Sequence, residues 1–157
     1  MTSGEYRAAP LDTTARVVTI LVLIMAGVFP FIPEMPVYGA LLLPLIFFTT
    51  WLFSVRCYTI RVETLLIHRP MWTTEIKLPP DSVFRFEPEI KKGLWRTAGN
   101  GGLFGYTGRF RNRDLGNFRA FATNWNTAVS ITSESTGYKL VITPESPEVV
   151  QPSEEVL

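Results

Sequence analysis

Two long apolar runs near the N-terminus dominate the hydrophobic pattern of the chain. No charged residue occurs within residues 17–33 or 35–55, and only Glu34 separates the two runs. An α-helix rises about 1.5 Å per residue, so roughly 20 residues cross the ~30 Å hydrocarbon core of a bilayer. Both runs are apolar on every helical face, which favours lipid as their surroundings. The pattern therefore predicts a hairpin of two membrane helices, at residues 16–33 and 36–55.

A cleaved secretory signal peptide is one alternative, because Arg16 precedes the first run. Small residues with the spacing of a cleavage site do not follow Pro33, and a second apolar run begins almost at once. A membrane anchor is therefore favoured over an export signal. A buried helical hairpin in the core of a soluble protein is the second alternative.

Arginines flank the predicted hairpin on both sides. Arg7 and Arg16 precede the first run, Arg56 and Arg61 follow the second, and the connecting turn has no Lys or Arg. Cytoplasmic flanks of membrane helices carry an excess of such residues. The sequence thus predicts an integral protein of the plasma membrane with two spans and both termini in the cytoplasm.

From residue 56 onward, short segments alternate between apolar and polar positions. This alternation is typical of β-strands, because successive side chains point to opposite faces of a sheet. The segments are evenly spaced and separated by turn residues, as in a small antiparallel sandwich or barrel of about seven or eight strands. The predicted strands are residues 58–62, 65–69, 72–78, 82–86, 108–113, 118–123, 128–132 and 138–143.

Composition narrows the chemistry that the chain can perform. It contains one cysteine, Cys57, and one histidine, His68, so it has neither an internal disulfide nor a zinc site built from several His and Cys ligands. The 15 Lys and Arg residues against 14 Asp and Glu give a net charge of +1, so any basic patch must be local.

Three segments of the β-rich part carry a family resemblance: the glycine-rich run at 99–110, Leu115 with Gly116, and the sequence YKLVITPESPE at 138–148. Together they resemble the bacterial pleckstrin-homology (PH) domain family found in small membrane-anchored proteins. The resemblance implies a half-open antiparallel barrel of about seven strands with a C-terminal helix. Because Pro152 interrupts the C-terminal segment, we expect that helix to be short.

The expected organisation has four parts. Residues 1–15 form a cytoplasmic tail, 16–55 the transmembrane hairpin, 56–149 the PH-like domain, and 150–157 a disordered tail. The overall fold class is therefore a membrane-anchored all-β protein.

The glycines at 99, 101, 102 and 105 invite comparison with phosphate-binding loops. The dinucleotide motif would need a third glycine where Phe104 stands, and a Walker loop would need a Gly-Lys-Ser/Thr sequence that is absent. We therefore expect Gly99, Gly101, Gly102 and Gly105 to form a structural loop that needs positive φ angles.

A local cluster of basic residues is the main candidate for a binding site. On a strand, Arg109, Arg111 and Arg113 occupy alternate positions and share one face. With Lys91 and Lys92 they are candidate contacts to anionic lipid headgroups, at about 1 kcal/mol per residue near a membrane. A solvated strand face that deters edge pairing is the alternative.

Catalytic chemistry has little support in the sequence. His68 lies on a predicted strand without a recognisable nucleophile motif. We expect no catalytic residue, no cofactor, no metal site and no nucleic-acid partner. The expected function is a non-enzymatic, membrane-anchored PH-like interaction module on the cytoplasmic face. Its partner is a protein, a second copy of this chain included, or anionic lipid. An accessory or regulatory subunit of a membrane enzyme or transporter is the alternative.

Overall fold

The computed structural model describes residues 4–33, 36–61 and 63–150. Two helices, α1 (Thr13–Val28) and α2 (Val37–Leu52), are accompanied by a 3₁₀ turn, η1 (Phe29–Phe31), that continues α1. The strands are β1 (Gly4–Arg7), β2 (Cys57–Arg61), β3 (Thr64–His68), β4 (Thr73–Lys77), β5 (Val83–Phe86), β6 (Trp95–Gly102), β7 (Gly105–Asn112), β8 (Gly116–Ala122), β9 (Val129–Ser133) and β10 (Tyr138–Ile142). Two further 3₁₀ turns are η2 (Trp125–Thr127) and η3 (Pro147–Val149).

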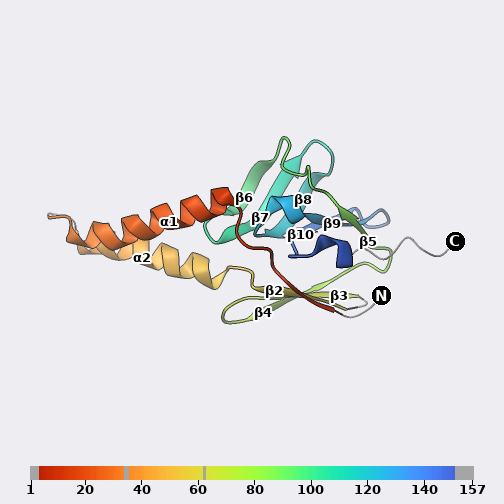
Figure 1. The fold of residues 1–157 in the computed structure, drawn as a ribbon, viewed down its shortest axis with the longest axis horizontal. Helices are drawn as coiled ribbons and strands as arrows, with labels where there is room; N and C mark the ends of the chain where they lie inside the picture. The colour runs from red at the N-terminus through yellow and green to blue at the C-terminus, as the bar shows by residue number, and fades with distance from the viewer. Residues whose placement is uncertain (1–3, 34–35, 62, 151–157) are drawn as a thin grey trace.

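The described strands form two separate sheets (Figure 1). One has the order β1-β2-β3-β4, and the other has the order β5-β9-β10-β8-β7-β6, in which β10 runs parallel to β8. The expected antiparallel barrel of about seven strands is therefore wrong: the fold is mostly β, but the sheets do not close. The chain passes from the first sheet to the second through Pro79 and Pro80, whose missing amide donors prevent continuous strand pairing there.

Residues 8–12 and strand β1 are part of the β domain. Strand β1 pairs antiparallel with β2. The Ala9 amide donates to the Thr143 carbonyl at 2.9 Å, and the Asp12 amide donates to the Thr123 carbonyl at 3.1 Å. Residues 4–12, which the sequence analysis assigns to a cytoplasmic N-terminal tail, are therefore hydrogen-bonded to the β domain. A four-residue strand has too short a pattern to be found without its partner.

The main hydrophobic core lies between the two sheets. Tyr58 and Ile67 of the first sheet are fully buried against Leu140 and Ile142 of the second. Each buried side chain of this kind contributes roughly 1.5–3 kcal/mol. The buried Tyr58 hydroxyl donates to the Phe121 carbonyl at 2.6 Å, so its polar group is satisfied.

A second core covers the opposite face of the six-stranded sheet. Phe110, Phe118 and Trp125 pack there, and Ala15 from the first turn of α1 is buried among them. The start of α1 is thus fixed to the domain. The helix begins three residues earlier than predicted because the Asp12 carboxylate caps it, accepting a hydrogen bond from the Ala15 amide at 2.8 Å.

Helices α1 and α2 leave the β domain together and lie side by side (Figure 1). The segment Thr13–Phe31, with mean hydropathy 2.0, is the described helix that is long and apolar enough to cross a membrane; the apolar part of α2, Leu41–Leu52, is shorter. Hence the two-span hairpin is not established by helix length. Both helices expose large apolar side chains, namely Val17, Ile20, Leu21, Leu23, Ile24, Met25 and Val28 on α1, and Val37, Tyr38, Leu41, Leu42, Leu45, Ile46 and Phe48 on α2.

The C-terminal end is a single 3₁₀ turn, Pro147–Val149, where a short helix is expected. Val150 follows it and is buried in the core between the sheets, so the predicted disordered tail does not begin at residue 150. Residues 151–157, the rest of that predicted tail, lie outside the described residues.

Candidate functional site

Strand β7 presents two of the three candidate arginines on one face. Arg109 and Arg111 are exposed, while Phe110 and Asn112 between and after them are buried. Arg113 lies in the turn that follows the strand. The shared face therefore exists for Arg109 and Arg111, and Arg113 is not part of the strand.

A third arginine, which sequence reasoning did not include in the site, completes this surface. Arg119 of β8 lies directly opposite Arg109 in the antiparallel pair. Like charges directly opposite each other destabilise a sheet, so this pair is unfavourable unless an anion compensates it. Cross-strand register brings the two together, and no pattern within one strand reveals it. We call Arg109, Arg111 and Arg119 the basic face.

A groove of about 650 Å³ lies at the basic face. Among the described residues, no acidic side chain forms an ion pair with any of the three arginines. Arg119 instead stacks on Phe121, with 4.9 Å from its guanidinium carbon to the ring centroid. The groove therefore offers uncompensated positive charge to an anionic partner. Its lining is Thr97, Arg109, Asn117, Phe118, Arg119, Thr136, Gly137, Tyr138 and Lys139.

Lys91 and Lys92 do not join the basic face. The neighbouring Ile90 packs in the second core beside Phe110, on the sheet face opposite the arginines. Lys92 forms an ion pair with Glu89 at 2.6 Å, and the Lys91 ammonium lies 3.9 Å from the Asp12 carboxylate. Their charges are partly compensated by these partners.

The four glycines belong to a β-hairpin of β6 and β7, so the expected loop is wrong in its secondary structure. Gly99, Gly102 and Gly105 have φ angles of 106°, 135° and 116°, whereas Gly101 is not among the residues with positive φ. A Cβ atom on Gly99 would overlap the Thr107 carbonyl oxygen of the paired strand. This geometry supports a structural role for the glycines, as close backbone approach requires them.

The tip of this hairpin touches both helices. The Phe104 amide donates to the Thr19 hydroxyl of α1 at 3.0 Å. The Phe104 ring packs edge-to-face on Phe47 of α2, with 4.8 Å between centroids. The glycine-rich hairpin therefore connects the second sheet to the helices.

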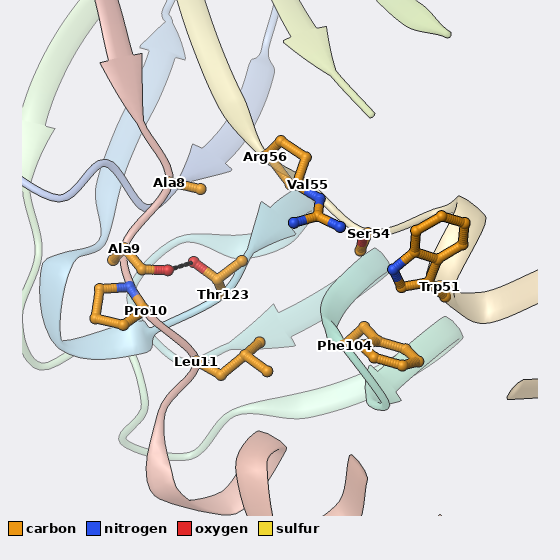
Figure 2. A pocket seen from close by; sticks show the side chains of 10 residues that line it. All are labelled: Ala8, Ala9, Pro10, Leu11, Trp51, Ser54, Val55, Arg56, Phe104 and Thr123. Carbon is orange, nitrogen blue, oxygen red and sulfur yellow. Dashed lines mark hydrogen bonds between the residues drawn. The ribbon is translucent and has the colours of Figure 1, made fainter. Parts of the chain in front are cut away.

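A pocket of about 350 Å³ lies where the helices meet the β domain. We call it the helix-base pocket, and Figure 2 shows its lining: Ala8, Ala9, Pro10, Leu11, Trp51, Ser54, Val55, Arg56, Phe104 and Thr123. The Thr123 hydroxyl donates to the Ala9 carbonyl at 2.6 Å and closes one wall. The Arg56 guanidinium lies over the Trp51 ring, 5.9 Å from its centroid. Sequence reasoning missed this pocket because its residues come from four separate segments.

Comparison with known families decides the identity of the β domain. The family model described as bacterial PH domain matches residues 56–154, more than half of the chain. The protein belongs to the bacterial PH domain family. No curated protein and no solved structure matches the chain.

The bacterial PH domain is joined to α2 by a second contact that sequence reasoning missed. Arg69, in the turn after β3, donates to the Phe53 carbonyl at 2.8 Å. Its guanidinium stacks on Phe53, Trp72 and Phe121 at 5.3 to 5.9 Å from the ring centroids. Burial, and next the charge of Arg119, lower the pKa of Arg69. The side chain thus attaches the β3–β4 turn to the end of α2.

The single histidine and cysteine of the bacterial PH domain have structural surroundings. His68 lies between the hydroxyls of Thr59 and Thr73, at 2.9 and 3.0 Å. The Cys57 sulfur lies 3.5 Å from a Glu5 carboxylate oxygen, and burial and this neighbour raise the pKa of the thiol. Within the part of the chain that the structure describes, no group of three or more His, Cys, Asp or Glu residues is arranged to hold a metal.

Proposed function

We propose that this bacterial PH domain protein is a non-enzymatic binding module, held on the cytoplasmic face of the plasma membrane by its two apolar helices. Its basic face binds an acidic surface of a partner protein. PH domains are generally non-catalytic binding modules, which agrees with this role. The observation that carries the proposal is the exposed basic face, whose arginines have no acidic partner among the described residues.

The anchor is supported by the exposure of the helices and by the pairing of β1 with β2. Apolar side chains on all sides of two adjacent helices are stable in lipid and unfavourable in water. Strands β1 and β2 flank the hairpin and are hydrogen-bonded to each other. If α1 alone crossed a bilayer, these two strands would lie on opposite sides of it. The pairing therefore supports two crossings with a turn on the far side.

The length of α2 is compatible with such a crossing. Its 16 residues span roughly 24 Å, against roughly 30 Å for the hydrocarbon core. A short helix is accommodated by local thinning of the bilayer at modest cost. The arginines at both ends of the hairpin favour the cytoplasm for the domain.

The direction of β7 favours a protein over lipid as the partner of the basic face. The strand begins at the hairpin tip that touches the helices and runs away from them (Figure 1). At ~3.3 Å per residue, Arg109 lies roughly 13 Å and Arg111 roughly 20 Å along the strand from Gly105. Attraction to lipid charge falls off over about 8 Å at physiological salt. The basic face extends beyond that distance from the helices.

Site-specific photocrosslinking in intact cells tests the proposal. A benzophenone amino acid replaces Asn117, which lines the groove, and mass spectrometry identifies what it captures. The matched control carries the same group at Asn126, which is exposed outside the groove. We expect a defined protein adduct from position 117 alone, and we expect R109Q/R111Q/R119Q to reduce its yield at least about tenfold.

Two outcomes would contradict the proposal. Adducts that are mostly lipid would assign the basic face to the membrane surface. Equal protein adducts with and without the three arginines would show that the captured protein is not held by the basic face. Sedimentation of each variant with alkaline-washed membranes verifies that the anchor is intact in both cases.

A further inference from the structure

The helix-base pocket brings together three hydrogen-bond donors. The Arg56 guanidinium, the Ser54 hydroxyl and the Trp51 indole edge lie on one side of it (Figure 2). None of the three side chains forms a hydrogen bond or ion pair with another described residue. Groups of this kind at a pocket are available to a ligand that accepts hydrogen bonds.

The opposite wall of the pocket is apolar. Pro10, Leu11 and Phe104 supply it, and no carboxylate lines the pocket within the described residues. The nearest acid along the chain, Asp12, is engaged by the Ala15 amide and the Tyr106 hydroxyl. The pocket therefore combines one uncompensated positive charge with apolar surface, which suits a ligand that is anionic at one end and hydrophobic at the other.

Its position specifies the ligand further. The pocket lies between the last turn of α2 and the segment just before α1, at the level where both helices meet the β domain. With the helices in a bilayer, this is the level of the lipid headgroups, where Trp side chains such as Trp51 are enriched. A volume of about 350 Å³ holds a phosphoglycerol group and the start of an acyl chain.

We propose that the helix-base pocket binds the phosphate of one anionic phospholipid. Arg56 donates to the two non-bridging phosphate oxygens, and Ser54 and the Trp51 N–H donate to the same two oxygens. The glycerol and first acyl carbons lie against Leu11 and Phe104. The planar guanidinium matches a phosphate in a way that an ammonium does not. This inference rests on the proposed membrane anchor.

Native mass spectrometry of the full chain tests the site. The protein is purified in a mild detergent, freed of lipid, and titrated with dioleoyl phosphatidylglycerol while the singly bound form is quantified. We expect Arg56→Gln to weaken binding of one lipid at least about tenfold and Arg56→Lys to restore it in part. Arg61→Gln is the matched control, because Arg61 is exposed at the other end of β2 and should bind as the natural chain does.

Each result bears on the proposal. Equal affinity in Arg56→Gln and Arg61→Gln would overturn it, provided that both variants keep the melting temperature of the natural chain. Displacement of the lipid by micromolar glycerol 3-phosphate would overturn the proposal that the bound phosphate belongs to a lipid. It would assign the site to soluble phosphate esters. Release of the chain by alkaline carbonate would overturn the anchor and the lipid site together. A chain that stays in membranes and binds no lipid would overturn the lipid site alone.

Discussion

Replacement of Asp12 should destabilise the junction between the helices and the β domain. The carboxylate is buried, with 7% of the residue exposed. It caps α1 through the Ala15 amide at 2.8 Å and accepts the Tyr106 hydroxyl at 2.9 Å. The Lys91 ammonium lies 3.9 Å away. One side chain therefore joins the first helical turn to the six-stranded sheet.

The expected loss follows from these contacts. Removing an N-cap side chain costs about 1 kcal/mol, and leaving a buried hydroxyl without its partner costs about 1–3 kcal/mol. Asp12→Ala should therefore lower the free energy of unfolding by roughly 2–4 kcal/mol. Asp12→Asn keeps an acceptor oxygen and loses the charge, so its loss should stay below about 1.5 kcal/mol. Burial and the Asp12 carboxylate both raise the pKa of Tyr106, so its hydroxyl stays a donor at neutral pH.

Chemical denaturation of the full chain in detergent micelles, followed by tryptophan fluorescence, measures these losses. Trp125 reports on the junction, because its ring centroid lies 5.0 Å from that of Tyr106. The double variant with Tyr106→Phe completes a thermodynamic cycle, and its coupling energy should be about 1–3 kcal/mol. A loss below about 0.5 kcal/mol in Asp12→Ala, or additive single variants, would refute the role of Asp12 as the joining residue.

Two further predictions concern the hairpin glycines and the topology. Gly99→Ala should lower the free energy of unfolding by at least about 2 kcal/mol, because a Cβ there would overlap the Thr107 carbonyl and because the φ angle of Gly99 is 106°. Gly101→Ala is the control and should lower the free energy of unfolding clearly less. Equal melting temperatures of the two variants would contradict this prediction. In a background without the native cysteine, an impermeant maleimide applied to intact cells should label a cysteine at Glu34 and not one at Thr2, whereas the reverse pattern would invert the orientation.

The pattern of apolar and polar residues predicted most of the core but not all of its strands. Strands β2 and β3 alternate between buried and less buried positions, and β10 ends in three consecutive apolar residues that are all buried. The structure has all three strands within one residue of the predicted positions. Strand β6 has the sequence WRTAGNGG, in which no alternation exists. Its conformation comes from pairing with β7, and glycine itself does not favour a strand. Such a strand is specified by its neighbour and not by its own residues.

The candidate site was predictable where it lies within one strand and not where it depends on contacts between segments. Arg109 and Arg111 follow from their spacing of two residues. The opposition of Arg109 and Arg119, and the ion pair that separates Lys91 from the site, both require the register of the sheet and the course of residues 87–94. The helix-base pocket was not predictable for the same reason, because four distant segments form it.

The attachment of the helices has a consequence for partner binding. The two helices lie between two paired strands, β1 and β2, so the β domain is held at both ends of the helical segment. Phe104 and Arg69 add contacts from two further turns to α1 and α2. A domain held by one flexible linker samples many orientations, and a partner must overcome that entropy on binding. Here the orientation of the basic face relative to the helices is already restricted. If the two helices cross a membrane as proposed, a partner in the same membrane would meet the arginines at a fixed height and angle, which would raise its effective concentration without any new contact.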